Sequence, residues 1–283
     1  MRILLSLLLA AAVSASTLLV GCSYTAAEDK PAAVEKPTAA KAAAAAEGNW
    51  GSIKGQIVFA GDVPDPKELN ITKDVKECKD SLKGAPLLDE EWVVNKKNKG
   101  VRWVYVWIAQ PPGVKAKLPI HPDLVKLKED KVVMDQPCCH FEPRCLAVRE
   151  GQIWVAKNSS ALAHNVHWEG GEDNPGDNPS LPAGKEIEFK DLKASLSVIT
   201  VNCGSHPWMK SWVRVFDHPY YAITDADGKF EIKDAPAGNF RLYTWHEGAG
   251  WLHKAEKLKQ GEPITIKAGE TLDLGKIEAK KTD

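Results

Sequence analysis

Two short segments of the chain carry side chains that could bind a metal ion together. The later segment, Cys203-Gly-Ser-His206-Pro-Trp-Met209, places a thiol, an imidazole and a thioether on one loop. The earlier segment, Ala-His164-Asn-Val-His167, supplies further imidazoles about forty residues before it. Two His and one Cys in a plane around the metal, with a Met at a longer axial distance, are typical of an electron-transfer copper site. The set favours copper over zinc, which more often recruits Cys and His without Met.

The stretch from about Val148 to Phe216 resembles the cupredoxins, in particular amicyanin and plastocyanin. In that family a strand ending in Asn is followed by His-Asn-Val-His, and later by Cys-x-x-His-Pro-aromatic-Met and a closing strand. The matching residues are Asn158, His164, Asn165, Val166, His167, Cys203, His206, Pro207 and Met209.

The resemblance implies a role for most of these side chains. His164, Cys203 and His206 would be the equatorial ligands of one type 1 (blue) copper ion. Met209 would be the axial ligand. Asn165 would brace the loop that carries the Cys.

Two other interpretations of the Cys203 loop stay open. In an exported chain thiols tend to oxidise, so Cys203 could be half of a disulfide and His206 a turn residue. A dinuclear copper centre, as in cytochrome oxidase subunit II, would need two Cys on the ligand loop, and this loop has one. The disulfide interpretation leaves His164 and Met209 unexplained, so we favour the single-copper site.

A second group of cysteines lies upstream of this loop. Cys138, Cys139 and Cys145 are close in sequence, with His140 among them, whereas Cys78 stands alone. A bond between the adjacent Cys138 and Cys139 would be strained, so one of them should reach Cys78. We expect a Cys78–Cys139 disulfide, with Cys138 and Cys145 nearby. The alternative is a second metal site built from these thiols and His140.

Other aromatic and histidine side chains have two candidate roles each. An exposed Trp208 beside His206 would make a docking patch for a protein partner, and core packing is the alternative. His218 and His246 would permit an auxiliary metal site if they lie close together. The other role for a His beside Trp or Tyr is a hydrogen-bonded edge residue. His167 is implied to be a neighbour of the ligands, not a ligand.

The N-terminus predicts export and a lipid anchor. Residues 1–21 carry one positive charge at Arg2 and then a nearly uncharged apolar run, the order of an export signal. Leu19-Val20-Gly21-Cys22 resembles the lipobox of bacterial lipoproteins, which implies cleavage before Cys22 and a lipid on that residue. A membrane-spanning anchor is the alternative. In that family, a Ser directly after the lipidated Cys, as Ser23 is here, favours the outer membrane over the inner one. We therefore expect a cell-envelope lipoprotein on the periplasmic face.

The rest of the chain predicts a tether and an all-β body. Residues 22–49 are rich in Ala, Lys and Pro and cannot bury enough apolar surface to offset their ordering entropy. From residue 50 onward, short segments rich in β-branched and aromatic residues alternate with turn residues. We predict an elaborated cupredoxin Greek-key β-sandwich over 50–217 and a small prealbumin-like β-sandwich over 218–283.

The second sandwich has a pattern of its own. Residues 224–247, TDADGKFEIKDAPAGNFRLYTWHE, resemble carboxypeptidase-regulatory-like and rhamnogalacturonan-lyase-associated modules. This is a likeness of fold and implies no lyase activity. Most of the stretch from Trp50 to Trp251 resembles exported bacterial proteins labelled methylamine-utilisation-like, which combine a cupredoxin core with motifs such as the Asp217–Ile232 segment here.

The balance of charges and the absence of common catalytic motifs argue against two classes of function. The chain has 37 Lys and Arg against 38 Asp and Glu, so it lacks the positive field on which nucleic-acid binding depends. No G-x-S-x-G, H-E-x-x-H or P-loop pattern is present, so no enzyme activity is expected. We predict a membrane-tethered carrier that passes single electrons to a redox protein in the envelope through a partly exposed edge of His206. Copper storage or delivery, and an unmetallated carbohydrate- or protein-interaction module, are the alternatives.

Overall fold

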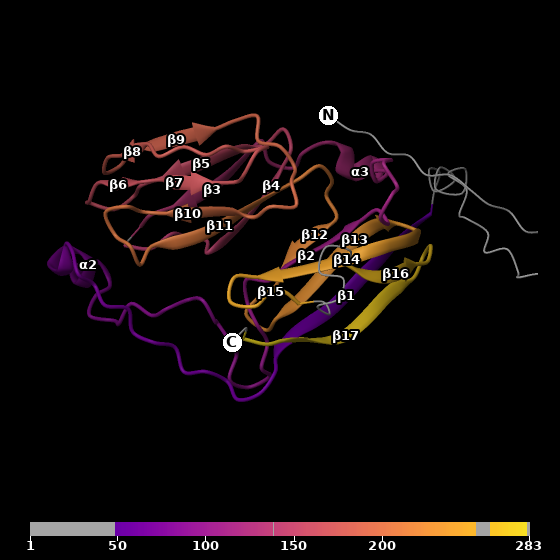
Figure 1. Ribbon diagram of the computed structural model, residues 1–283, viewed down its shortest axis with the longest axis horizontal. Helices are drawn as coiled ribbons and strands as arrows, with labels where there is room; N and C mark the ends of the chain where they lie inside the picture. The colour runs from indigo at the N-terminus through magenta and orange to yellow at the C-terminus, as the bar shows by residue number, and fades with distance from the viewer. Residues whose placement is uncertain (1–48, 138, 253–260, 282–283) are drawn as a thin grey trace, which may run out of the picture. The chain divides into compact units, whose positions relative to one another are not determined.

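The computed structural model describes residues 49–137, 139–252 and 261–281 (Figure 1). The predicted export signal (1–21), the lipid site Cys22 and all of the tether (22–49) except Asn49 lie outside these residues. Within the described ranges, no helix is long and apolar enough to cross a membrane.

Strands dominate the described chain, which confirms the predicted all-β class. In β1 (Trp50–Phe59), buried Ile53, Ile57 and Phe59 are separated by more exposed residues. Side chains of a strand alternate between its two faces, so this spacing turns one face towards a core. The helices that the described chain contains are short: α2 (Val75–Ser81) and α3 (Pro122–Val125).

A first group of strands, here called the site sandwich, holds the residues of the predicted metal site. Its sheets have the strand orders β4-β11-β10-β7, β3-β5-β9 and β6-β8. Its core packs Met134, Trp154 and Phe189 with Cys203 and Met209. The strands are β3 (Lys131–Asp135), β4 (Cys145–Arg149), β5 (Ile153–Lys157), β6 (His164–Asn165), β7 (His167–Glu169), β8 (Ser180–Leu181), β9 (Glu186–Phe189), β10 (Ile199–Asn202) and β11 (Lys210–Phe216).

The remaining strands form what we call the flanking sandwich. One sheet has the order β13-β1-β17, and the other has the order β12-β2-β14-β15 with β16 also paired to β14. A separate apolar core, including Ile53, Val106 and Ile232, lies in this part of the chain. Besides β1, the strands are β2 (Tyr105–Ala109), β12 (Tyr221–Ile223), β13 (Lys229–Pro236), β14 (Gly238–His246), β15 (Gly250–Trp251), β16 (Glu262–Ile266) and β17 (Thr271–Ala279).

The sheets divide the chain differently from the boundary expected after residue 217. β1 pairs antiparallel with β13 and parallel with β17, and β2 pairs with both β12 and β14. Residues 50–109 therefore supply two strands to the flanking sandwich, and the site sandwich is an insertion between β2 and β12 (Figure 1). The expectation that 50–217 forms one body is corrected accordingly. Hydrophobic alternation locates a strand but does not identify its hydrogen-bonding partner.

Buried polar contacts join the two sandwiches. The Tyr105 hydroxyl of β2 lies 3.0 Å from the Leu146 carbonyl oxygen and 2.8 Å from that of Trp212, both in the site sandwich. Arg144 and Glu247 form a bidentate ion pair, with donor–acceptor distances of 2.7 Å at both contacts. These contacts satisfy polar groups that would be costly to bury alone.

Candidate metal centre

The loop between β10 and β11 positions three of the predicted ligands. The strands are antiparallel, with Asn202 opposite Lys210, so Cys203 and Met209 face each other at the loop's two ends. The Met209 N–H donates to the His206 carbonyl at 2.9 Å, and the His206 N–H donates to the Cys203 carbonyl at 3.2 Å. These bonds form successive tight turns that hold the three side chains on one short span.

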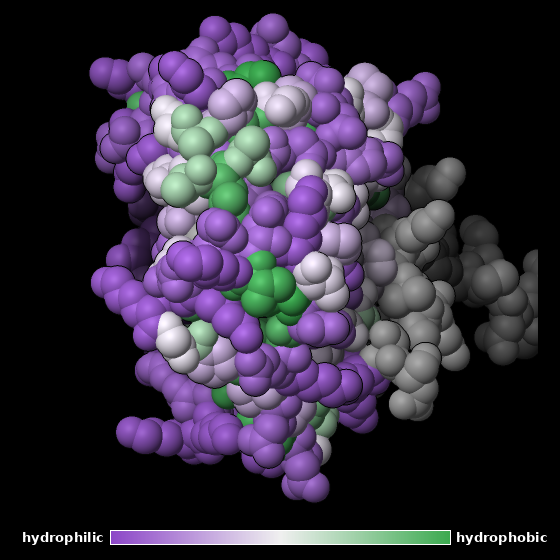
Figure 2. Space-filling view, turned by 90° about the vertical axis from the view of Figure 1, so that its left-hand side faces the viewer, coloured by the Kyte–Doolittle hydropathy of each residue, from purple (hydrophilic) through white to green (hydrophobic). Residues whose placement is uncertain are grey.

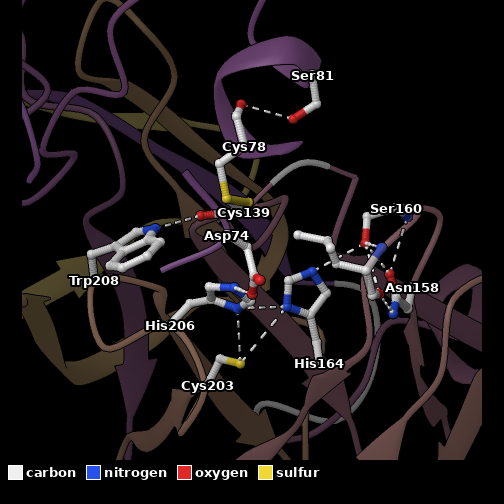
Figure 3. Close-up of a disulfide and its surroundings, with 11 residues drawn as sticks. Asp74, Cys78, Ser81, Cys139, Asn158, Ser160, His164, Cys203, His206 and Trp208 are labelled. Atoms are coloured by element: carbon white, nitrogen blue, oxygen red, sulfur yellow. Dashed lines mark hydrogen bonds and ion pairs between the residues drawn. A yellow bond between two sulfur atoms is a disulfide. The ribbon is translucent and has the colours of Figure 1, made fainter. Parts of the chain in front are cut away.

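The fourth predicted ligand comes from another sheet. His164 lies on β6, opposite Leu181 of β8. Its Nδ1 atom is 3.8 Å from the Cys203 Sγ and 3.0 Å from the His206 Nδ1, and the His206 Nδ1 is 3.7 Å from the same sulfur (Figure 3). The three side chains are 2%, 1% and 0% exposed, in the order His164, Cys203, His206. The structure therefore brings together three of the residues named from sequence.

Hydrogen bonds on the outer side of each ring assign the tautomers. The Nε2 of His206 lies 2.9 Å from the Asp74 Oδ2, which can only accept, so Nε2 carries the proton. The Nε2 of His164 lies 3.1 Å from the Ser160 hydroxyl, which donates to the Asn158 Oδ1 at 2.7 Å and so accepts from His164. When both rings are neutral, both Nδ1 atoms consequently present lone pairs towards Cys203 and, 3.0 Å apart, towards each other.

The electrostatics keep His164 available as a ligand. Burial, and to a smaller extent the neighbouring His206, lower the pKa of its imidazole to about 4, and Asp74 opposes the shift. A metal binds the neutral imidazole, so protons do not compete with it at His164 near neutral pH.

Met209 and Asn165 both lie in the surroundings of Cys203. The Met209 side chain is 1% exposed and packs in the same core as Cys203. The Asn165 Oδ1 accepts from the Gly204 N–H at 2.8 Å and lies 3.3 Å from the Cys203 Sγ. Asn165 thus ties β6 to the beginning of the ligand loop.

The predicted exposure of the His206 edge is wrong. The imidazole is fully buried, with Asp74 at its Nε2 and the Trp208 ring at a centroid distance of 5.2 Å. Trp208 is half-buried, and its Nε1 donates to the Cys139 carbonyl at 3.1 Å. The covering residue Asp74 is 132 positions away in sequence, so the local motif could not indicate this contact.

The structure joins Cys78 of α2 to Cys139 in a disulfide (Figure 3). Cys203 and Cys145 are free thiols, and the Cys145 Sγ lies 3.3 Å from the Trp103 carbonyl oxygen. Burial raises the pKa of the Cys145 thiol well above its usual range, which keeps it protonated. Cys203 is thus not a half-cystine, and the Cys139 sulfur is already engaged, which counts against the alternative second metal site. Cys138 lies outside the described residues.

The other histidines considered from sequence each pack against different neighbours. His218 packs beside Phe216 and Tyr220, whereas His246 packs on Trp92. His167 lies on β7, with its Nε2 3.2 Å from Glu169.

The face in Figure 2 is mainly hydrophilic, with small separate hydrophobic areas.

The grouped side chains could hold a metal ion, and a thiol with imidazoles suits copper. His164, Cys203 and His206 form a group whose ligand atoms lie within 4.8 Å of one another. A second such group, Cys78, Cys139 and His206, has both of its sulfurs bonded in the disulfide. Sequence reasoning missed Asp74 and Ser160, which hold the outer ring nitrogens. Asp74 has no signal near the motif, and Ser160 has only its position in the loop between Asn158 and His164.

No family model and no curated protein sequence match the chain. A reduced amicyanin variant is 22% identical over 32% of this chain and 87% of its own, with a TM-score of 0.28. A purple cupredoxin from Nitrosopumilus maritimus is 17% identical over 31% of this chain and 100% of its own, with a TM-score of 0.26. A copper-containing nitrite reductase from Thermus scotoductus is 20% identical over 38% of this chain and 25% of its own, with a TM-score of 0.29. Scores this low decide neither family nor function.

Proposed function

We propose that this protein is a one-electron carrier that binds one type 1 copper ion through His164, Cys203, His206 and Met209. The observation that carries the proposal is the convergence of two Nδ1 lone pairs and one free thiol in a buried space. Buried electron-pair donors that face one another are costly without a cation between them. When bound, copper would supply reversible one-electron chemistry.

The residues around the ligands suit a carrier. Asp74 and Ser160 hold the rings from behind, Asn165 holds the loop, and the tight turns of the loop fix the spacing of Cys203 and Met209. A ligand set held in this way changes little when the charge of the ion changes. The burial of the ligands favours firmly held copper, whereas storage or delivery would need ready exchange.

Copper titration of the metal-free protein tests the proposal. We expect saturation at one equivalent of Cu(II) and an intense blue absorption, as in the resembled family. Cys203→Ser should lose the colour and keep the unfolding transition of the metal-free protein. The matched control is Cys145→Ser, which changes the other described free thiol and should stay blue. A colourless wild type under oxidising conditions with copper bound would contradict the proposal.

We also propose that a lipid on Cys22 holds the protein on the periplasmic face of a cell-envelope membrane, where it would exchange electrons with a redox protein. The order of charge, apolar run and Gly21-Cys22 supports the anchor. The full chain, expressed in a Gram-negative host, should fractionate with membranes, and Cys22→Ser should not be acylated. Acylation that persists in Cys22→Ser would refute the anchor.

A further inference from the structure

One carboxylate reaches the metal centre from outside the site sandwich. Asp74 lies in the long connection between β1 and β2, immediately before α2. Its Oδ2 is 2.9 Å from the Nε2 of His206, and its side chain is 35% exposed while that of His206 is fully buried. Asp74 therefore contacts a buried ligand ring while its own side chain is partly exposed to solvent. Figure 3 shows its carboxylate beside the His206 ring.

The backbone conformation of Asp74 is unusual for a residue that immediately precedes a helix. The side chain of an Asp before a helix usually accepts a hydrogen bond from a backbone N–H of the first turn. Asp74 makes no such bond, and it has the left-handed values φ 50° and ψ 39°. A non-glycine residue held there indicates that the surroundings enforce the conformation. In this case the carboxylate bonds to His206 instead of to the helix.

The disulfide fixes this segment beside the site. The Cys78 N–H donates to the Asp74 carbonyl at 2.9 Å, so the two residues share one helical turn. The sulfur of Cys78 is bonded to Cys139, whose carbonyl accepts from the Trp208 side chain of the ligand loop. The turn that carries Asp74 is thus linked covalently to the site sandwich.

We infer that Asp74 is a positioning residue for the metal centre, an inference that rests on the proposed copper binding. By accepting from the Nε2–H of His206, it stabilises the tautomer whose Nδ1 lone pair faces Cys203 and His164. Its negative charge behind the ligand also stabilises Cu(II) relative to Cu(I). Carboxylates that orient a ligand imidazole typically affect metal affinity by about 10–100-fold.

Asp74→Asn tests this inference because it keeps the shape of the side chain and removes the charge. Asn also tolerates the left-handed backbone better than most residues. We expect Cu(II) affinity to fall by about tenfold or more. If Cu(I) affinity is unchanged, the reduction potential should rise by about 59 mV for each tenfold loss. The matched control is Asp80→Asn, on the same helix, where the carboxylate pairs with exposed Lys76. Asp80→Asn should leave both quantities unchanged.

A second measurement needs no copper. Nitrogen-15 shifts of the metal-free wild type should show His206 protonated at Nε2 and not at Nδ1. In Asp74→Asn the form protonated at Nδ1 should become populated, since the new amide can donate to Nε2. A wild-type His206 protonated at Nδ1 would overturn the inference.

The two proposals fail separately. A wild type that binds no copper refutes the proposed function. A blue wild type whose affinity, potential and His206 tautomer are all unchanged in Asp74→Asn refutes only the role of Asp74. An equal effect in Asp80→Asn would also refute it, because the effect would then reflect charge on the helix and not contact with His206.

Discussion

The Asn165 side chain serves both segments that supply ligands. It belongs to β6 beside His164, and its Oδ1 accepts from the Gly204 N–H while lying 3.3 Å from the Cys203 sulfur. Its Nδ2 donates to the Asn178 Oδ1. Asn165 thereby connects the early and late motifs without being a ligand, and it should matter even before metal binds.

Asn165→Ala should destabilise the metal-free protein. The change leaves the Gly204 N–H without its acceptor, a loss that typically costs about 1–3 kcal/mol when the group is buried and less when water reaches it. Urea unfolding should place the loss at the lower end, because Gly204 is exposed. Asn178→Ala removes only the Nδ2 contact and should cost less. Equal losses in the two variants would show that the bracing of the ligand loop is unimportant.

At the scale of elements, strands with clear alternation were predictable and short ones were not. β3 (Lys131–Asp135) and β17 (Thr271–Ala279) belong to the segments, rich in β-branched or alternating apolar residues, from which the all-β body was predicted. β6 was missed because two residues cannot show a period. α2 was missed because it has seven residues, of which only Cys78 is buried, so no apolar stripe marks it.

The residues of the metal centre likewise include some that could be predicted from the sequence and one that could not. His164, Cys203 and His206 stand in compact motifs, and local hydrogen bonds within a hairpin and across β6 bring them together. Asp74 was not predictable, since an Asp before a short helix ordinarily indicates a cap. Its contact with His206 depends on where a long connection returns to the site sandwich, which no local pattern records.

At the scale of the whole molecule, an inserted sandwich needs contacts that hold it to the strands on both sides of it. Arg144 immediately precedes β4, and Glu247 immediately follows β14 of the flanking sandwich. Both side chains of this pair are 6% exposed. The Arg144 Nη1 also donates to the Lys210 carbonyl at 3.1 Å, next to the end of the ligand loop. The pair thus lies between the flanking sandwich and the strand that follows the ligands.

Glu247→Gln should be among the more destabilising single changes at a polar residue. It leaves the Arg144 charge buried without its partner, which typically costs about 3–5 kcal/mol. The double variant Arg144→Met with Glu247→Leu removes both charges and should recover most of that loss, because an apolar pair avoids the desolvation penalty. The control is Lys96→Ala, which breaks the exposed pair with Asp65 and should cost less than about 1 kcal/mol. Chemical denaturation of the four proteins measures these differences. If Glu247→Gln is no less stable than Lys96→Ala, the buried pair does not hold the sandwiches together. The Tyr105 hydroxyl contacts and the apolar cluster around Tyr105 and Trp107 must then do so.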